Sequence, residues 1–420
     1  MDLKKIPKKK LSINIILVLF ISLVFLYDHF IGYLSYLDEI LAILCLGSWI
    51  FIKRIKLLPL EYLILFLLFF ILIAGLASNF FTFQKIAIKA IFLDTLSFYK
   101  AFIVYFGVRI YFKNIGISDV LPGLKKIAKL GFIILLIVFV VDYFIWIFPR
   151  SQRFGLFSFE LFFNHSSRLS FAFSFIFIVL YPYYIKKWKA ILIFILLAGL
   201  ITLRVKYIGF MLVSFIFIFN KRLIFGIKKS FIYAFLLLVP IVLFFVFKDW
   251  IMYYFLEGKI TTGWSRGILL RYSFIISYDF FPLGTGFGSY ASFFSGQDYS
   301  WVYDYYDLNY VWGISKENHH FLADQYWPMV LGQFGVFGFF AMLGVMVSFI
   351  NILISKIKST ADKFKKDTII AGLLGLILLL IDSTSDAIFS QNRGVVIFIF
   401  IALIINEYYK TNIEEEKITS

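Results

Sequence analysis

The sequence PMVLGQFGVFG at residues 328–338 begins a long apolar run directly after the only long polar segment of the chain, residues 248–327. Three polar motifs mark that segment: GWSRGILLRY at 263–272, FFPLGTGFGSY at 280–290 and SKENHHFLADQYW at 315–327. Nearly all of the remaining sequence consists of apolar runs separated by short charged connections. The sequence therefore predicts one large polar loop among hydrophobic helices.

The composition excludes a soluble globular protein. The 420 residues are 61% hydrophobic and have a mean hydropathy of +0.90, which no ordinary soluble domain reaches. A helix of about 20 apolar residues crosses a bilayer, and the runs here are continuous instead of alternating with period two. We predict an all-α polytopic membrane protein with about twelve transmembrane helices, at residues 11–27, 40–52, 57–76, 93–111, 130–148, 169–185, 190–202, 208–219, 231–247, 328–350, 368–381 and 394–405.

The charged connections predict the topology. Every second connection is rich in lysine, which places these connections, and both termini, in the cytoplasm by the positive-inside rule. The net charge of +16 then reflects topology, and no nucleic-acid partner is predicted. The chain divides into residues 1–247 with nine transmembrane helices, residues 248–327 as one large external loop carrying catalytic and substrate-binding residues, and residues 328–420 with three helices and a cytoplasmic tail.

Arginine is distributed differently from lysine. Most lysines fall on the predicted inner side, whereas most arginines fall on the outer side. A guanidinium binds two phosphate oxygens at once and keeps its charge when partly desolvated, so two or three of the outer arginines could bind an anion. The alternative is that they pair with outer carboxylates or lipid headgroups. The outer arginines are Arg150, Arg153, Arg168, Arg204, Arg266, Arg271 and Arg393.

A helix is predicted over residues 266–278, followed by the glycine motif GTGFG at 284–288. This motif predicts a tight turn, because a nucleotide-binding loop would need a preceding strand and a following Gly-Lys-Ser/Thr. Arg266 and Arg271 are five residues apart, which separates them by about 140° around a helix. Both can reach one ligand only if Arg266 binds it from the helix N-terminus, where free N–H groups also favour a phosphate.

Polar side chains crowd the last residues before the apolar run at 328. A neutral imidazole or a carboxylate can remove a proton from a sugar hydroxyl, and either His320 or Asp324 could do so here. The alternative is that these groups are ordinary hydrogen-bonded surface residues. Two adjacent histidines with an aspartate four residues on lack a third strong ligand, so no metal site is predicted. The group consists of Glu317, His319, His320, Asp324 and Gln325.

The same segment is rich in aromatic residues, most densely in YSWVYDYYDLNYVW at 299–312. Aromatic rings pack against the apolar faces of sugars, and they also form belts at membrane interfaces. We interpret part of this run as the lining of a sugar-binding groove.

The order of these motifs resembles the O-antigen ligase and polymerase family. The resemblance includes an Arg-containing helix that leads to PLGTGFGSY, and then a polar pair followed by GQFGVFG. RFGLFSFELFFNHSS at 153–167 resembles the Arg-x-x-Gly...Asn segment of that family, and ITLRVKYIGF at 201–210 resembles its Ser/Thr-Arg turn. In the ligase branch, His and then Asn, Ser or Gln precede nine residues, Gly, two residues and Gly. Here Asp324 and Gln325 precede the same spacing to Gly335 and Gly338, and aspartate in place of histidine favours a polymerase.

The resemblance implies a GT-C-like architecture and a polysaccharide polymerase in the bacterial cytoplasmic membrane, with its active site on the outer side. Such an enzyme transfers a glycan from undecaprenyl pyrophosphate to a hydroxyl of the next lipid-linked repeat unit. Pyrophosphate is already a good leaving group, so no nucleotide or other cofactor is expected, and the resemblance suggests no metal. The implied partners are the lipid-linked oligosaccharide, membrane lipids, a repeat-unit flippase and a chain-length regulator.

Residue roles follow from this reading. The catalytic base is Asp324 or His320, and the predicted substrate-binding residues are Arg153, Arg204, Lys206, Arg266, Arg271, His319 and Gln325. Two rival functions remain: an O-antigen ligase that passes the polymer to another acceptor, and a transporter or flippase of lipid-linked glycan. Transporters are commonly built from repeated halves with broken helices, and the sequence shows no such repeat.

Overall fold

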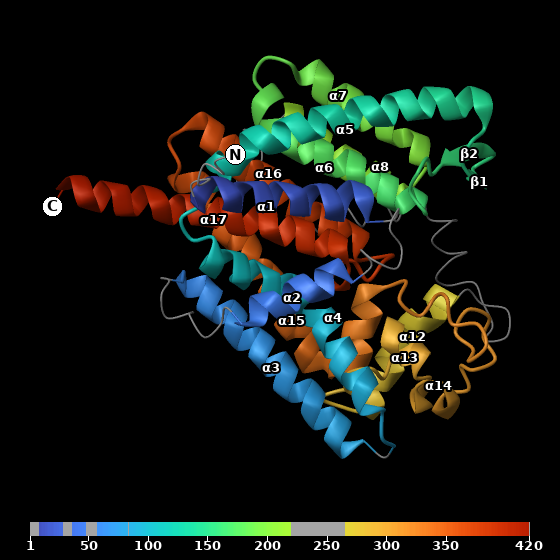
Figure 1. The fold of residues 1–420 in the computed structure, drawn as a ribbon. Helices are drawn as coiled ribbons and strands as arrows, with labels where there is room; N and C mark the ends of the chain where they lie inside the picture. The colour runs from blue at the N-terminus through green and yellow to red at the C-terminus, as the bar shows by residue number, and fades with distance from the viewer. Residues whose placement is uncertain (1–7, 28–35, 48–56, 83, 220–264, 420) are drawn as a thin grey trace, which may run out of the picture.

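The computed structural model describes residues 8–27, 36–47, 57–82, 84–219 and 265–419, with the backbone alone for 8 and 409–419. Within these residues the chain is helical apart from its loops and one antiparallel hairpin, β1 (Arg150–Arg153) with β2 (Leu156–Phe159). The predicted all-α class is confirmed. Figure 1 shows the helices α1 (Lys8–Ile21), α2 (Leu37–Gly47), α3 (Pro59–Phe81), α4 (Ile88–Tyr111), α5 (Ile117–Ile145), α6 (Ser166–Tyr184), α7 (Lys189–Ala198), α8 (Val205–Phe219), α12 (Ser265–Asp279), α13 (Phe293–Gln297), α14 (Trp301–Tyr305), α15 (Tyr326–Ser359), α16 (Lys363–Asp382) and α17 (Asn392–Thr419), with the short turns η1 (Ser22–Leu26), η3 (Gly199–Thr202) and η5 (Ile388–Ser390).

Long apolar helices coincide with part of the predicted membrane spans. Within the described ranges, six helices are long and apolar enough to cross a membrane, namely α1 with η1, α3, α4, α5, α6 and α15. Helix α7 with η3, and helix α8, are shorter apolar helices. Every predicted span within the described ranges overlaps a helix, whereas the span at 231–247 lies outside them. The chain is thus an α-helical membrane protein.

The helices differ in how much of their surface is buried. Helix α4 is buried on nearly all sides and packs against α17, where the rings of Phe102 and Phe398 lie 5.1 Å apart. Helix α5 is peripheral and exposes an apolar face that includes Ile133, Ile137 and Val140. Because exposed aliphatic side chains are favourable only in an apolar medium, this face of α5 suits contact with lipid tails.

Helix α5 begins earlier than the predicted span at 130–148. It runs without interruption from Ile117 to Ile145. The buried side chains Val120, Leu121, Leu124 and Ala128 recur at helical spacing, so the buried face of the span continues through the lysine-bearing residues.

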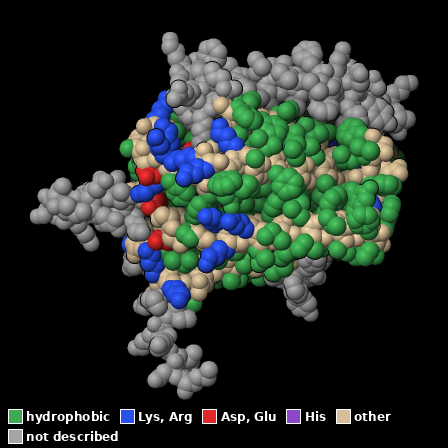
Figure 2. All heavy atoms as spheres, turned by 90° about the horizontal axis from the view of Figure 1, so that it is seen from above, with side chains coloured by type: hydrophobic (Ala, Val, Ile, Leu, Met, Phe, Trp, Pro, Cys, Tyr) green, Lys and Arg blue, Asp and Glu red, His purple; other side chains and the backbone are tan. Residues whose placement is uncertain are grey.

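One end of the bundle carries the lysines. Figure 2 shows Lys and Arg side chains gathered toward the end from which α17 projects, while hydrophobic side chains cover the middle of this face. The start of α1 and the C-terminal part of α17 both lie at this lysine-rich end (Figure 1). Lys9 pairs there with Asp119 at 2.8 Å, and Ser118 donates to Glu407 at 2.6 Å. The hairpin, the start of α12 and the loops before α15 lie at the opposite end.

The glycine motif at 284–288 forms a tight turn after α12, as predicted. Gly284, Gly286 and Gly288 all have positive φ angles. The turn fills a break in α15 that the sequence analysis did not predict: at Gly335 the backbone leaves helical geometry, with φ 62° and ψ −166°. The N–H of Thr285 donates to the carbonyl of Gly332 at 3.1 Å, and that of Gly286 to the carbonyl of Gln333 at 2.8 Å. These bonds satisfy carbonyls that the break would otherwise leave unpaired.

Close packing requires glycine on both sides of this contact. A Cβ on Gly284 would lie 2.6 Å from the carbonyl oxygen of Gly332, and a Cβ on Gly335 would lie 2.3 Å from that of Pro282. Asn79 at the end of α3 binds the same turn, donating to the carbonyl of Phe287 at 2.9 Å and accepting from its N–H at 2.8 Å. The turn thereby fixes the start of α15, which positions the residues described next.

Candidate functional site

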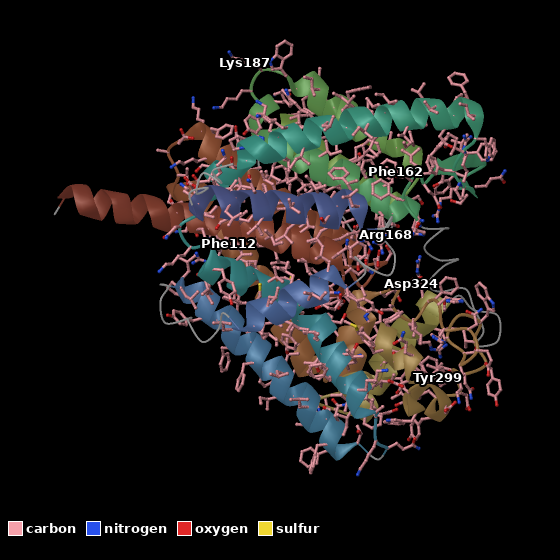
Figure 3. The ribbon with its side chains drawn as sticks, viewed as in Figure 1. Phe112, Phe162, Arg168, Lys187, Tyr299 and Asp324 are labelled. Atoms are coloured by element: carbon pink, nitrogen blue, oxygen red, sulfur yellow. The ribbon has the colours of Figure 1, made fainter. Side chains whose placement is uncertain are left out.

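Five chain segments meet at the opposite end and bring charged side chains together. They are the hairpin with the turn to α6, the turn between η3 and α8, the start of α12, the residues before α15, and the connection from α16 to α17. Figure 3 shows Asp324 and Arg168 at this end, and Phe112 and Lys187 toward the other. We call the charged group formed here the charged cluster; it contains Arg153, Glu160, His165, Arg204, Lys206, Arg266, Asp324, Asp386 and Arg393.

Arg266 and Asp324 form an ion pair. Arg266 is the second residue of α12, and its Nε and Nη2 donate to Oδ2 of Asp324 at 3.0 and 2.8 Å. Both side chains are partly accessible, with 32% and 25% of their surface exposed. Burial raises the pKa of the Asp324 carboxyl above its ordinary value, while the adjacent Arg266 opposes that rise. Asp324 is therefore a stronger base than an ordinary surface aspartate.

The backbone around Asp324 is held by the connection between α16 and α17. The N–H of Tyr326 donates to the carbonyl of Ser383, and the N–H of Ala387 donates to the carbonyl of Ala323, both at 3.2 Å. The indole N–H of Trp327 donates to the Ser383 hydroxyl at 2.9 Å. Two segments about sixty residues apart in sequence thus place Asp324 beside Asp386.

Asp386 joins two cations. Its Oδ2 lies 2.5 Å from Nη2 of Arg393 and 3.3 Å from Nζ of Lys206. Burial alone would raise the pKa of Asp386, but Arg393 and Lys206 together hold that pKa below its ordinary value. Lys206 also lies 3.8 Å from Asp382. Asp386 therefore stays ionised and anchors these cations within the cluster.

Arg204 is paired with neutral groups. Its Nε donates to the Ser166 hydroxyl at 2.7 Å, and its Nη2 lies 2.6 Å from Nε2 of His165. Burial, together with the charges of Arg204 and Lys206, lowers the pKa of His165 to about 3, so this imidazole is neutral near pH 7. No carboxylate among the described residues lies within ion-pairing distance of Arg204.

The pKa of Arg204 also indicates that little negative charge lies near this side chain. Burial lowers this pKa from its ordinary value, and the positive charges of Arg153 and Arg266 lower it further. The partly buried Glu160 and Asp386 act in the other direction but do not cancel the effect. A bound anion would stabilise this guanidinium.

The structure brings together four of the predicted substrate-binding residues. Arg204, Lys206 and Arg266 lie in the charged cluster with Asp324, and half-buried Arg153 on β1 lies close enough to influence both Arg204 and Glu160. Arg271 is different, because its side chain is exposed on α12 and no ion pair of this residue is formed with the described part of the chain.

The predicted histidines and Gln325 have other surroundings. His320 is exposed, and Nδ1 of His319 lies 3.2 Å from the carbonyl of Lys316. Neither ring contributes to the electrostatics of Asp324. Gln325 is 2% exposed at the N-terminus of α15, and its Oε1 has no hydrogen-bond donor among the residues described.

Four residues of the cluster were not singled out as site residues from the sequence: Glu160, His165, Asp386 and Arg393. His165 follows the RFGLFSFELFFN segment, which already resembled a family motif, and Arg393 was one of the outer arginines. Asp386 could have been found only as a polar residue in an outer connection. Within the described ranges, no group of three or more His, Cys, Asp or Glu side chains is arranged to hold a metal ion.

In the loop between α13 and α15, the buried and the exposed side chains differ in chemical type. It buries its aliphatic residues, and the exposed rings are those of Tyr305, Tyr310 and Trp312. The other exposed side chains of residues 297–320 are charged, amide or imidazole groups: Gln297, Asp298, Asp304, Asp307, Lys316, Glu317 and His320. A surface of rings and polar groups without aliphatic residues differs from the lipid-facing surface of α5, and it suits an aqueous ligand such as a sugar.

Fold and site together define an α-helical membrane protein with a cation-rich polar site at one end of its bundle. The chain matches none of the protein-family models with which it was compared, and a search of curated proteins finds no match either.

Proposed function

We propose that this chain is a membrane glycosyltransferase that polymerises polysaccharide repeat units carried on undecaprenyl pyrophosphate, with the charged cluster on the outer side of a bacterial cytoplasmic membrane. The observation that carries the proposal is the pairing of Asp324 with Arg266 beside Arg204, which has no carboxylate partner in the described part of the chain. A base next to cations that can bind an anion is what transfer from a lipid diphosphate to a hydroxyl requires.

In the proposed reaction Asp324 accepts the proton of the acceptor hydroxyl. The acceptor oxygen forms a bond to the anomeric carbon of the donor sugar, and the bond from that carbon to the phosphate oxygen breaks. The electron pair leaves with undecaprenyl diphosphate. The raised pKa of Asp324 supports this role, because a base works best when its pKa lies closer to the working pH.

The arginines would hold the diphosphate. Arg204, with Arg153 and Arg266 nearby, offers guanidinium groups to the oxygens on which negative charge develops as the bond breaks. Diphosphate binding by Arg266 would also weaken its hold on Asp324, which frees the carboxylate at the moment when a base is needed. Lys206, which is held by Asp386 at 3.3 Å, adds positive charge but cannot bind two oxygens in the bidentate way of a guanidinium.

Asp324 supports the polymerase over the ligase within the proposed class. It stands where the resembled ligase motif has histidine, and its pKa is set by burial and by the charges of Arg266, Asp386 and Lys206. We therefore assign the role of base to Asp324. Gly335 retains a backbone role, since its break in α15 accommodates the glycine turn.

The test is sugar transfer by purified protein. Wild-type protein in detergent should lengthen an undecaprenyl-pyrophosphate-linked oligosaccharide, detected by gel or mass spectrometry. Asp324→Asn should reduce the rate by about 100-fold or more, as expected for loss of a general base. The matched control is Asp298→Asn, which makes the same change at an exposed aspartate and should leave the rate unchanged.

Full activity of Asp324→Asn would remove the assigned base, and absence of any transfer by folded wild-type protein would remove the enzyme. In cells, loss of a polymerase leaves single repeat units on the lipid, whereas loss of a ligase leaves unattached polymer. The second pattern on deletion would replace the polymerase with the ligase.

A further inference from the structure

A surface of exposed apolar side chains surrounds the point where the chain leaves α5. The helix ends at Ile145, and the hairpin of β1 and β2 follows beyond that end (Figure 1). The large apolar side chains of this region are 43% to 78% exposed. We call them the hairpin surface: Tyr143, Phe144, Ile145, Trp146, Ile147, Phe154, Leu156 and Phe157. Exposed apolar surface of this extent marks contact with a partner outside the chain.

The hairpin surface carries no charge. Among residues 140–157, all of which the structure describes, the other exposed positions are Val140, Val141, Pro149, Gln152 and Gly155. Arg150 and Asp142 form a buried ion pair at 3.3 Å, with side chains 3% and 1% exposed, and Arg153 is half-buried. Exposing apolar surface to water costs about 25 cal/mol per Å², whereas the same surface is favourable among lipid tails.

The hairpin is packed onto the end of α5. Oδ1 of Asp142 accepts the N–H groups of Ile147 and Phe148, both at 2.8 Å, which fixes the turn that follows the helix. The rings of Trp146 and Phe157 lie 5.0 Å apart and join this turn to β2. The hairpin surface is therefore continuous with the exposed apolar face of α5 described above.

The tip of the hairpin projects away from the rest of the chain. Phe154 and Gly155 form the turn between the strands, with φ angles of 53° and 74°. A bulky residue rarely adopts a positive φ, and asparagine or glycine is the usual choice in such a turn. A Cβ on Gly155 would meet no atom within 4 Å. A phenylalanine held at this tip, with half of its surface exposed, is favourable where the surroundings are apolar.

The length of α5 places the hairpin at the far boundary of a bilayer. Toward the lysine-rich end, Nζ of Lys125 lies 4.1 Å from the ring centre of Tyr183, and that of Lys129 lies 5.6 Å from the ring centre of Tyr184. Lysines and tyrosines of this kind mark a membrane interface. From Lys129 to Ile145 the helix rises about 24 Å, at about 1.5 Å per residue. Because the hydrocarbon core is about 30 Å thick, it extends past the end of α5 to the hairpin surface.

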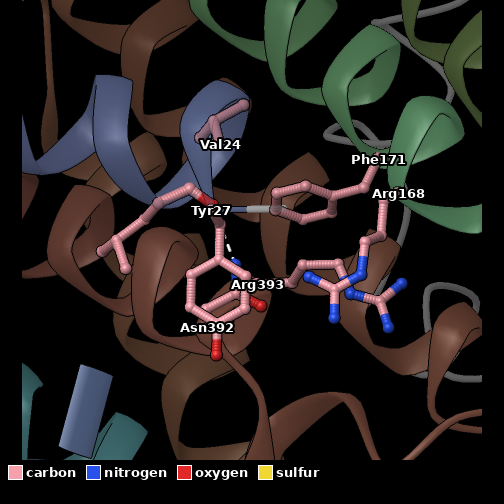
Figure 4. Close-up of a pocket in the computed structure, with 7 residues that line it drawn as sticks. Val24, Tyr27, Arg168, Phe171, Asn392 and Arg393 are labelled. Atoms are coloured by element: carbon pink, nitrogen blue, oxygen red, sulfur yellow. Dashed lines mark hydrogen bonds between the residues drawn. The ribbon is translucent and has the colours of Figure 1, made fainter. Parts of the chain in front are cut away.

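The cations at this end of the bundle lie inside it. Figure 4 shows the guanidinium groups of Arg168 and Arg393, which line one small pocket between η1, α6 and α17. Arg393 is 4% exposed and is paired with Asp386. Charged side chains of membrane-embedded regions face the interior of the bundle. Inward cations behind an uncharged apolar surface are therefore the arrangement expected of a region surrounded by lipid.

The hairpin also contacts the segment that carries Arg204. The hydroxyl of the buried Ser158 donates to the carbonyl of Thr202 at 2.7 Å, two residues before Arg204. By the register of the strands, Arg153 lies on the same side of the hairpin as Ser158. The depth of the hairpin in a membrane would thus set the depth of the charged cluster.

We infer that the hairpin surface is embedded in the lipid bilayer, so that its apolar side chains contact hydrocarbon tails and the charged cluster lies at the level of the lipid headgroups. The uncharged surface, its continuity with α5 and the length of α5 all specify lipid as the partner. The inference does not require sugar transfer. Where it is combined with the proposed function, a lipid diphosphate reaches Arg204 while its tail stays in the bilayer.

The test measures the surroundings of a spin label in full-length protein reconstituted into phosphatidylcholine vesicles. Cys45→Ala removes the single cysteine, and Phe154→Cys or Leu156→Cys then carries a nitroxide. Paramagnetic resonance compares collisions with oxygen, which concentrates in lipid, with collisions with a water-soluble nickel complex. Both labels should favour oxygen, as a label at Ile137→Cys on α5 should. The matched control is Tyr310→Cys, an exposed ring position in the loop before α15, where the ratio of oxygen to nickel collisions should be several-fold lower.

Two outcomes would overturn the inference. Labels at 154 and 156 that meet the nickel complex as often as the label at 310 would place the hairpin in water. Labels shielded from both reagents would indicate a protein partner, such as a second copy of the chain, in place of lipid. Leu156→Cys lies outside the strained turn, so it gives a reading even if Phe154→Cys disturbs the tip. An inactive protein whose labels favour oxygen would retain this inference while removing the proposed function.

Discussion

The two ends of the helical bundle use buried arginine in different ways. At the lysine-rich end, Arg109 is matched: Glu61 accepts from its Nε at 2.8 Å and from its Nη2 at 3.1 Å, and Asn406 accepts from its Nη1 at 2.5 Å. At the opposite end, Arg204 contacts the Ser166 hydroxyl and the neutral ring of His165. The first guanidinium is paired with a carboxylate, whereas the second has no carboxylate partner among the residues that the structure describes.

The difference separates a structural arginine from a candidate binding residue. Breaking a matched buried pair leaves a buried charge without a partner, so such a pair opposes unfolding or rearrangement. Arg109 and its partners join α3, α4 and α17 in this way. A cation that lacks a carboxylate and is surrounded by other cations is instead stabilised by an anion from outside the chain. Burial alone does not distinguish the two; the partners do.

The first test changes the buried pair of Glu61 and Arg109 at the lysine-rich end, where the largest effect on stability is expected. Glu61→Gln keeps the shape of the side chain but leaves Arg109 buried without its counter-charge. The free energy of unfolding should fall by about 3–5 kcal/mol, as for other broken buried pairs. The measurement is the thermal or denaturant midpoint in detergent, together with the transfer rate per folded molecule, which should not change.

Lys365→Met provides the control for this variant. Lys365 lies 3.8 Å from Glu407 and is 46% exposed, so its removal should cost about 0–1 kcal/mol. If Glu61→Gln were as stable as Lys365→Met, the pair of Arg109 and Glu61 would not stabilise the bundle. The structural role assigned to Arg109 would then be wrong.

The opposite end is tested by exchanging arginine for lysine. Arg204→Lys keeps one positive charge but loses the fork that binds two oxygens. We expect the transfer rate at low substrate concentration to fall by about tenfold, the value of one charge-assisted hydrogen bond, while stability changes little. Arg271→Lys makes the same exchange at an exposed position and should retain full activity. Equal effects of the two variants would contradict the assignment of Arg204 as a binding residue.

Much of the fold could be predicted from the sequence because long apolar runs have few structural solutions in a bilayer. The turn at 284–288 was predictable in the same way from its glycines. The break at Gly335 was not, since GQFGVFG also fits an uninterrupted helix, and the break depends on a partner loop some fifty residues earlier in the sequence. The start of α5 at Ile117 was missed because the lysines beyond it interrupt the apolar run without interrupting the helix.

The sequence allowed many residues of the candidate site to be selected, but it did not show which of them contact one another. Arg266 and Asp324 were both selected, but the sequence could not show that they contact each other, because the contact joins two ends of a long loop. The five-residue spacing of Arg266 and Arg271 correctly indicated that they do not share a helical face. Asp386 and His165 were missed because one polar residue in a short connection carries no pattern, and their importance comes from neighbours distant in sequence.

The smallest expected effect is a change in the pH dependence of transfer. If Asp324 is the base, the rate should fall as the pH decreases through its pKa, because the protonated carboxyl cannot accept a proton. Burial raises that pKa, so the fall should be centred above the ordinary value for aspartate, about 3.9. His165 has a pKa of about 3 and is neutral throughout this range, so His165→Gln should lower the rate without moving the midpoint. The measurement is the rate from pH 4 to pH 8 with folding checked at each value. A midpoint that moves in His165→Gln would assign the titration to the histidine and would contradict the assignment of Asp324 as the base.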